Sequence, residues 1–269
     1  MVKLLNGQSL QAFILDMDGV LWRGAEPIGD LPLIFSQILD MGCKVALATN
    51  NATRSIEQFV EKLHGFGVSL DSRLVINSAE AAAEYLRNKH PAGGPVYIIG
   101  EEGLQQALAL HGFFHCELNP LAVVVALDRG LTYEKLSLAS RLIRSGVDFI
   151  GANPDNTLPT PEGLIPGSGS ILAFLETASG RAPTIIGKPQ PEMYQIILER
   201  LGTRPENTLV VGDRLETDIA GGQAAGCPTA LVLSGVTSEA VALAYPHPPT
   251  LIATDLGNLV LQLIGDGGP

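Results

Sequence analysis

Two aspartates follow an apolar stretch near the start of the chain, in FILDMDGVLWRG at residues 13–24. Asp16 ends the stretch and Asp18 comes two positions later. Ligands of parallel sheets bind outside the carboxyl ends of the strands, where two carboxylates repel each other unless a cation or a proton offsets them. The pair is therefore a candidate for metal binding and for nucleophilic or acid–base catalysis. The alternative is a helix cap at Asp16 and a turn at Asp18 and Gly19.

Two other segments offer groups that could bind an anion. Thr49, Asn50 and Asn51 follow an apolar stretch and provide a hydroxyl and two amides just before a predicted helix. Lys188, in TIIGKPQPEMY, also follows an apolar stretch, and a lysine there is partly desolvated unless an anion or carboxylates neutralise it. From each segment alone, the alternatives are helix caps for the polar trio and an ordinary surface position for the lysine.

A second acidic pair, Asp213 and Asp218, follows the apolar strand of TLVVGDRLETDIAGG, and Asp218 stands near the start of a helix predicted at residues 215–225. Hard oxygen ligands of this kind suit Mg²⁺, although two helix-cap acids would have the same appearance. Taken together, the four segments contain a nucleophile, a general acid/base, metal ligands and a cation, which is the inventory of phosphoryl transfer. The GxGxxG, GxSxG and HExxH signatures of other chemistries are absent from the sequence.

Strands alternating with helices must position these groups. Apolar runs alternate with amphipathic helical patterns, which predicts an α/β fold with parallel sheets covered on both faces. Ten strands are many for one sheet in 269 residues, so we expect two α/β bodies. We expect a long loop at residues 154–169, near a domain junction. The predicted strands are residues 12–16, 44–49, 74–77, 96–99, 122–127, 148–152, 184–187, 208–212, 229–233 and 250–253.

Composition excludes several classes of protein. With 17 basic and 28 acidic residues the net charge is −11, which disfavours nucleic acid and anionic membranes as partners. The longest clean apolar run has seven residues, far short of the about 18 that span a membrane. The first residues contain no apolar signal-peptide core, and the three cysteines are far apart. We therefore expect a cytoplasmic enzyme without disulfides.

The four segments, in this order, resemble the motifs of the haloacid dehalogenase superfamily. Their wording is similar to the subfamily of p-nitrophenyl phosphatase, NagD and phosphoglycolate or pyridoxal phosphatase (subfamily IIA), and the similarity covers nearly the whole chain. The resemblance implies a Rossmannoid, doubly wound parallel-sheet core at residues 1–81 and 183–269. It also implies an inserted α/β (C2-type) cap at residues 82–182 that controls substrate specificity and can mediate a homodimer. The matching strings are DMDGVLWRG, ATNN, GKPQPEMY and GDRLETDI.

The resemblance also implies roles for single residues. Asp16 would attack phosphorus, and Asp18 would protonate the leaving alcohol and then activate water. Mg²⁺ would be held by the Asp16 and Asp213 carboxylates and the Asp18 backbone carbonyl, with Asp218 beside them. Thr49, Asn50, Asn51 and Lys188 would bind the phosphoryl oxygens. In the cap, Asn153 and Asp155 lie in a stretch similar to the substrate-facing loop of the family, or form a structural Asx turn.

The expected function is hydrolysis of small phosphorylated metabolites, with Mg²⁺ as cofactor and an aspartyl-phosphate intermediate. Two alternatives remain open. A phosphotransferase or phosphomutase would need a second substrate that captures the aspartyl-phosphate before water does. A catalytically idle phosphate-ligand binder of the same fold would usually have lost a motif aspartate, whereas Asp16 and Asp18 are both present.

Overall fold

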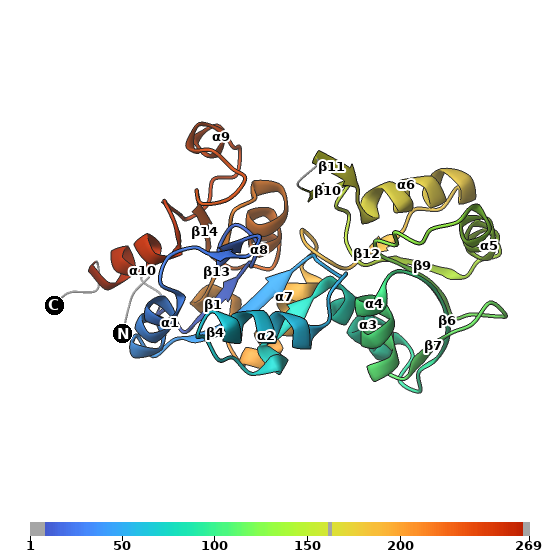
Figure 1. The fold of residues 1–269 in the computed structure, drawn as a ribbon, viewed down its shortest axis with the longest axis horizontal. Coiled ribbons are helices and arrows are strands. Elements are labelled where there is room, and N and C mark those ends of the chain that lie inside the picture. The colour runs from blue at the N-terminus through green and yellow to red at the C-terminus, as the bar shows by residue number, and fades with distance from the viewer. Residues whose placement is uncertain (1–8, 161–162, 266–269) are drawn as a thin grey trace. The chain divides into compact units, whose positions relative to one another are not determined.

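The computed structural model describes residues 9–160 and 163–265 and divides into two compact units. Unit 1 comprises Met1–Thr49, Glu57–Ile76 and Pro189–Pro269, and unit 2 comprises Asn50–Ile56 and Asn77–Lys188. The second unit thus begins before the predicted cap boundary at residue 82 and ends after residue 182. Figure 1 shows the elements of both units.

Unit 1 is built on a six-stranded sheet in the order β15-β14-β13-β1-β4-β5. β1 (Ala12–Leu15) pairs in parallel with β13 (Thr208–Gly212) on one side and β4 (Lys44–Thr49) on the other. Every residue of β1 and β13 is buried, as expected for central strands of a covered parallel sheet. The chain order reverses between β1 and β13, so the carboxyl ends of these two strands form the switch point where α/β proteins bind ligands.

Unit 2 has its own five-stranded sheet, in the order β12-β9-β8-β6-β7, with every pair parallel. Its core lies between this sheet and helices α5 (Tyr133–Arg144) and α6 (Ser168–Ser179), where Val123, Ile143 and Leu175 are fully buried. The predicted α/β class, with two bodies built on parallel sheets, is confirmed.

The remaining elements follow the strands as crossover helices or short edge elements. Helix ends carry the expected signals; for example, α7 stops at Gly202, which has the left-handed φ of 64° that suits glycine. The other bounds are β2 Trp22–Arg23, β3 Glu26–Pro27, α1 Leu31–Asp40, α2 Ile56–Gly65, η1 Ser72–Leu74, β5 Val75–Asn77, α3 Ser78–Lys89, β6 Gly94–Ile99, α4 Glu102–Leu110, β7 Phe113–His115, β8 Ala122–Val125, β9 Asp148–Gly151, β10 Thr157–Thr160, β11 Gly163–Pro166, β12 Thr184–Ile185, α7 Glu192–Leu201, η2 Pro205–Asn207, η3 Leu215–Ile219, α8 Ala220–Ala224, β14 Thr229–Val232, α9 Glu239–Leu243, β15 Leu251–Ala253 and α10 Leu256–Gly265.

Two sequence-based expectations were wrong in detail. The segment predicted as a loop at residues 154–169 contains an antiparallel hairpin, in which Thr157 pairs with Pro166 and Leu158 with Ile165. The helix predicted after Asp213 begins as a π-helix, η3, before it continues as α8. π-Helical turns are rare and frequently lie at functional sites, and this one carries Asp218.

Within residues 9–160 and 163–265, no helix is long and apolar enough to cross a membrane.

The three cysteines are free and differ in burial, which predicts different reactivity. Burial raises the pKa of the Cys43 thiol to about 11 and that of Cys227 to about 12, so at pH 8 only about one Cys43 thiol in a thousand is the reactive thiolate. Cys116 is partly exposed. We expect a disulfide reagent to label Cys116 rapidly and the other two only slowly, faster as the pH rises. Three equal fast phases in the native protein would contradict this burial; guanidinium-unfolded protein is the control.

Candidate active site

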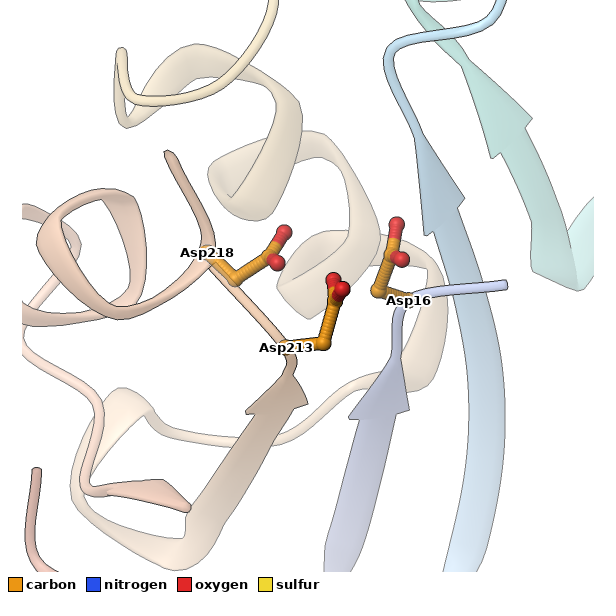
Figure 2. Close-up of side chains that lie close together, drawn as sticks. All are labelled: Asp16, Asp213 and Asp218. Atoms are coloured by element: carbon orange, nitrogen blue, oxygen red, sulfur yellow. The ribbon is translucent and has the colours of Figure 1, made fainter. Parts of the chain in front are cut away.

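Three aspartates from distant parts of the sequence meet at one edge of the unit 1 sheet (Figure 2). Asp16, Asp213 and Asp218 each contribute a carboxylate oxygen, and these oxygens all lie within 4.8 Å of one another. Asp213 and Asp218 are buried, and Asp16 is partly buried. The structure therefore brings together three of the predicted site residues.

The sheet places two of these aspartates. Asp16 follows β1 and Asp213 follows β13, and the two strands are hydrogen-bonded neighbours in register. The pairing continues past the end of β1, because the Asp16 N–H donates to the Val211 carbonyl at 2.9 Å. Both carboxylates consequently leave the sheet at the same edge, at its switch point.

Backbone N–H groups hold the carboxylates of the second acidic pair. The Val236 N–H donates to Asp213 Oδ2 at 2.7 Å, and the Arg214 N–H donates to Asp218 Oδ2 at 3.1 Å. In addition, Tyr194 donates its hydroxyl to the Asp218 carbonyl at 3.2 Å. The two N–H bonds orient the carboxylates, and the Tyr194 bond holds the backbone of Asp218.

Two glycines make room for the Asp213 carboxylate. Gly19 has a φ of +88°, and a Cβ there would lie 2.5 Å from Asp213 Oδ2. A Cβ on Gly235 would overlap the same carboxylate. Gly19 belongs to the predicted motif, whereas Gly235 was not predicted, because its only sequence signal is a glycine after the apolar strand β14.

The donor set fits a hard divalent cation. Three carboxylates this close repel one another, and two of them have lost most of their hydration, so the cluster is stabilised by a cation that takes oxygen ligands. Mg²⁺ and Ca²⁺ are both of that kind. The side chain of Asp18 is not part of the cluster; it accepts a hydrogen bond from the Trp22 indole, and its predicted metal ligand is the backbone carbonyl.

Thr49 is the last residue of β4 and is buried. Since Leu15 of β1 pairs with Leu47 of β4, Thr49 lies beyond the paired region at the same carboxyl edge as Asp16. The register thus places Thr49 at the same edge of the sheet as the acidic cluster.

In unit 2, Asn50 and Lys188 are joined through the lysine backbone. The Lys188 N–H donates to Asn50 Oδ1 at 2.9 Å, and Asn50 Nδ2 donates back to the Lys188 carbonyl at 3.0 Å. Asn50 Nδ2 also donates to Asp155 Oδ1 at 3.1 Å. Residues more than a hundred positions apart are therefore locked together by one amide, and the Lys188 residue is 3% exposed.

A second layer of contacts holds Asn50. Its carbonyl accepts from Ser78 Oγ at 2.6 Å and from Asn153 Nδ2 at 2.8 Å. Asn153 is 5% exposed, and its Oδ1 accepts from the Asp155 N–H at 3.2 Å, which is the Asx turn that the sequence offered as an alternative. Ser78, at the start of α3, was not predicted, because no local pattern marks a serine that bonds a residue 28 positions away.

Asn51, the third of the polar residues after β4 predicted to bind phosphate, is hydrogen-bonded to a neighbouring residue in the sequence. Its Oδ1 accepts from the Thr53 N–H at 3.0 Å and from the Thr53 hydroxyl at 2.6 Å. This local bonding gives the turn after Asn50 a defined shape before α2 begins.

Comparisons with known proteins show which family the chain belongs to. Models of the haloacid dehalogenase-like hydrolases and of HAD-hydrolase-like proteins match residues 13–114 and 185–259, respectively. The dihydroxyacetone phosphatase of Corynebacterium glutamicum (strain R) is 34% identical over 248 residues, which are 92% of this chain and 90% of that protein. The chain belongs to the haloacid dehalogenase-like hydrolases.

Solved structures of this hydrolase family agree closely with the fold. The 4-nitrophenylphosphatase of Thermotoga maritima superposes with a TM-score of 0.89 at 32% identity, covering 94% of this chain and 97% of that one. The glycerol phosphate phosphatase of Mycobacterium tuberculosis, in complex with magnesium, has a TM-score of 0.86 at 36% identity, covering 96% and 79%. This haloacid dehalogenase-like hydrolase is a phosphatase of small phosphorylated metabolites, and the expected subfamily of p-nitrophenyl phosphatase and NagD is confirmed.

The acidic cluster predicts a metal-dependent rise in stability. In the metal-free protein, saturating Mg²⁺ should raise the midpoint of thermal unfolding by about 5 °C, because ligand binding at a hundred times Kd contributes about 2.7 kcal/mol. Asp213→Asn should lose most of this shift and be no less stable in EDTA, since one of three repelling charges is gone. Asp40→Asn, which alters an exposed carboxylate at the end of α1, should keep the full shift. Equal shifts in both variants would mean that the cation binds elsewhere.

Proposed function

We propose that this phosphatase is Mg²⁺-dependent and hydrolyses phosphomonoesters through an aspartyl-phosphate on Asp16. The observation that carries the proposal is the convergence of Asp16, Asp213 and Asp218 at the carboxyl ends of the adjacent strands β1 and β13. A carboxylate there can approach a phosphate dianion only if positive charge offsets the repulsion. Lys188 would supply positive charge directly, and the acidic cluster would supply it by binding a cation.

In the first step an Asp16 carboxylate oxygen attacks phosphorus, and the bond from phosphorus to the leaving oxygen breaks. Asp18 gives its proton to that oxygen, so the product leaves as a neutral alcohol. In the second step Asp18 takes a proton from water, whose oxygen attacks phosphorus as the bond to Asp16 breaks. Inorganic phosphate is released, and both aspartates return to their starting states.

Asp16, Asp213 and the Asp18 backbone carbonyl would hold the Mg²⁺, with Asp218 beside them. When bound, the ion supplies positive charge that lowers the electrostatic cost of bringing phosphate to carboxylates. Thr49, Asn50, Asn51 and Lys188 form the phosphoryl-binding group of this proposal; we define this set as the phosphate cradle.

Within the phosphate cradle, Asn50 acts through Lys188. The Asn50 amide bonds the Lys188 backbone through both Oδ1 and Nδ2, and Nδ2 also bonds Asp155. The amide therefore fixes the backbone from which the lysine side chain extends. Asn153 and Ser78 hold Asn50 in turn, so we assign Asn153 a structural role. Of the two predicted cap contacts, Asn153 and Asp155, the partly exposed Asp155 is then the one proposed to contact substrate.

We assign residues 77–188 of unit 2, with their own sheet and the β10–β11 hairpin, to the predicted cap that selects the substrate. Relatives include phosphatases named for dihydroxyacetone and for glycerol phosphate, so three-carbon phosphates are the first class to test. Three exposed apolar side chains lie in or within four residues of the edge strand β7 in the sequence, Leu110, Phe114 and Leu118, and they support a homodimer through this unit. Free cysteines support a cytoplasmic location.

The nucleophile is tested by Asp16→Asn. An amide is not a nucleophile toward phosphorus, so release of phosphate from 4-nitrophenyl phosphate should fall by at least about 10⁴-fold, while the unfolding midpoint stays near that of the wild type. The wild type, assayed from pH 5 to 9 with Mg²⁺ and with EDTA, should release phosphate only with the metal. Substantial activity of Asp16→Asn would remove Asp16 from the proposal. A wild type that releases no phosphate unless a second acceptor is added would favour a phosphotransferase.

Coupling between Asn50 and Lys188 tests the phosphate cradle. Asn50→Ala should raise KM and the inhibition constant of inorganic phosphate about 10-fold, because the Lys188 backbone loses both of its hydrogen bonds to the Asn50 amide. In a Lys188→Ala background the same change should have little further effect, since both act through one ammonium group. Additive effects in the double variant would show that Asn50 acts independently of Lys188.

A further inference from the structure

We propose that Trp22 is a positioning residue that orients the carboxyl group of Asp18 for proton transfer. The inference rests on the proposed acid–base role of Asp18 and adds to it a residue outside the metal and phosphate ligands. The observation behind it is a hydrogen bond from Trp22 Nε1 to Asp18 Oδ1 of 2.9 Å. Trp22 is the single tryptophan of the chain.

The two partners of this bond differ sharply in their surroundings. Trp22 is fully buried, whereas Asp18 is exposed. An exposed aspartate samples several side-chain rotamers, and only some of them place an oxygen where a leaving group or a water will be. A bond from a buried donor to Oδ1 restricts that sampling, and it leaves Oδ2 as the oxygen that exchanges the proton. The protonated carboxyl accepts this bond through Oδ1, and the ionised carboxylate that remains after proton transfer accepts it about twice as strongly.

The indole is itself fixed on its other sides. Lys62 Nζ lies 3.9 Å from the ring centroid, and the same amine donates to the Gly24 carbonyl at 2.8 Å. The Phe66 ring lies 5.9 Å away at an interplanar angle of 40°. A cation over the face of an indole is attracted by the ring electrons and polarises the ring, which strengthens Nε1–H as a donor.

The backbone around Trp22 ties it to the catalytic turn. The Gly19 N–H donates to the Trp22 carbonyl at 2.8 Å, so the turn that carries Asp18 closes on the residue that holds its side chain. Trp22 then begins the short hairpin of β2 and β3, in which it pairs with Pro27. The acid–base residue and its donor therefore lie on one hydrogen-bonded segment of seven residues, Asp16–Trp22, directly after β1.

The experiment compares two substrates of similar shape that differ in their need for an acid. 4-Nitrophenolate leaves without protonation, whereas phenolate from phenyl phosphate is a much poorer leaving group. The ratio kcat/KM reports the steps up to loss of the alcohol, and therefore the acid role of Asp18 alone. Trp22→Phe, which removes the N–H donor, should lower kcat/KM about 10-fold or more for phenyl phosphate and less than about 3-fold for 4-nitrophenyl phosphate.

A closer replacement separates the hydrogen bond from packing. Because Trp22 is the only tryptophan, biosynthetic replacement of tryptophan by benzothienylalanine exchanges its N–H for sulfur in an isosteric ring and changes nothing else. It should show the same selective loss, with an unchanged unfolding midpoint. Phe66→Leu, which alters the ring packing but keeps the donor, should affect both substrates equally. Selective loss in Phe66→Leu, or equal loss for both substrates in both Trp22 variants, would overturn the inference.

Asp18→Asn distinguishes failure of this inference from failure of the proposed function. If Asp18→Asn shows the selective loss and the Trp22 variants do not, Asp18 is the acid and Trp22 does not position it. If Asp18→Asn affects both substrates equally, the acid role itself is wrong, and the Trp22 inference falls with it.

Discussion

Repulsion among carboxylates is the constraint on which the rest of this structure depends. Asp16, Asp213 and Asp218 bring ligand oxygens within 4.8 Å of one another in a largely buried place, where negative charge is poorly solvated. A chain can hold such an arrangement only if rigid elements impose it. Here the hydrogen-bonded register of β1 and β13 imposes it. The buried core of the sheet offsets the unfavourable free energy of carboxylate repulsion.

The same constraint explains the small residues and backbone donors around the cluster. Gly19 and Gly235 leave the space that the Asp213 carboxylate occupies, and peptide N–H groups of Arg214 and Val236 partly compensate charge without blocking access to it. A lysine or arginine in their place would neutralise the carboxylates and compete with a metal ion. Backbone donors of this kind orient the carboxylates and leave them negatively charged, which suits the cation-dependent mechanism proposed above.

The positive charge of the proposed site comes from Lys188, whose backbone is held by its own set of hydrogen bonds. Lys188 is buried in unit 2, and the Asn50 amide grips its backbone on both sides of the peptide. Asn153 and Ser78 hold Asn50, so three residues, Asn50, Ser78 and Asn153, together fix the backbone of Lys188. The hydrogen bonds that hold Asp213 and Asp218 lie within unit 1, and those that hold Asn50 and Lys188 lie within unit 2.

The sequence by itself determined the α/β class, all ten of the predicted strands, and the family, because buried strands and strand-end polar residues leave a local signature in residue type and spacing. It did not reveal the β10–β11 hairpin, whose prolines and glycines read as a loop, nor the π-helical turn that carries Asp218. Only the tertiary structure decided that the Asn50 amide holds Lys188, that Ser78 and Asn153 support it, and that a buried indole holds the exposed Asp18. The contacts of Asn50 join side chains to backbone 28 to 138 positions away, so the folded chain and not the neighbouring sequence decides the partners. The Trp22–Asp18 bond joins two side chains four positions apart, and the shape of the turn between them decides it.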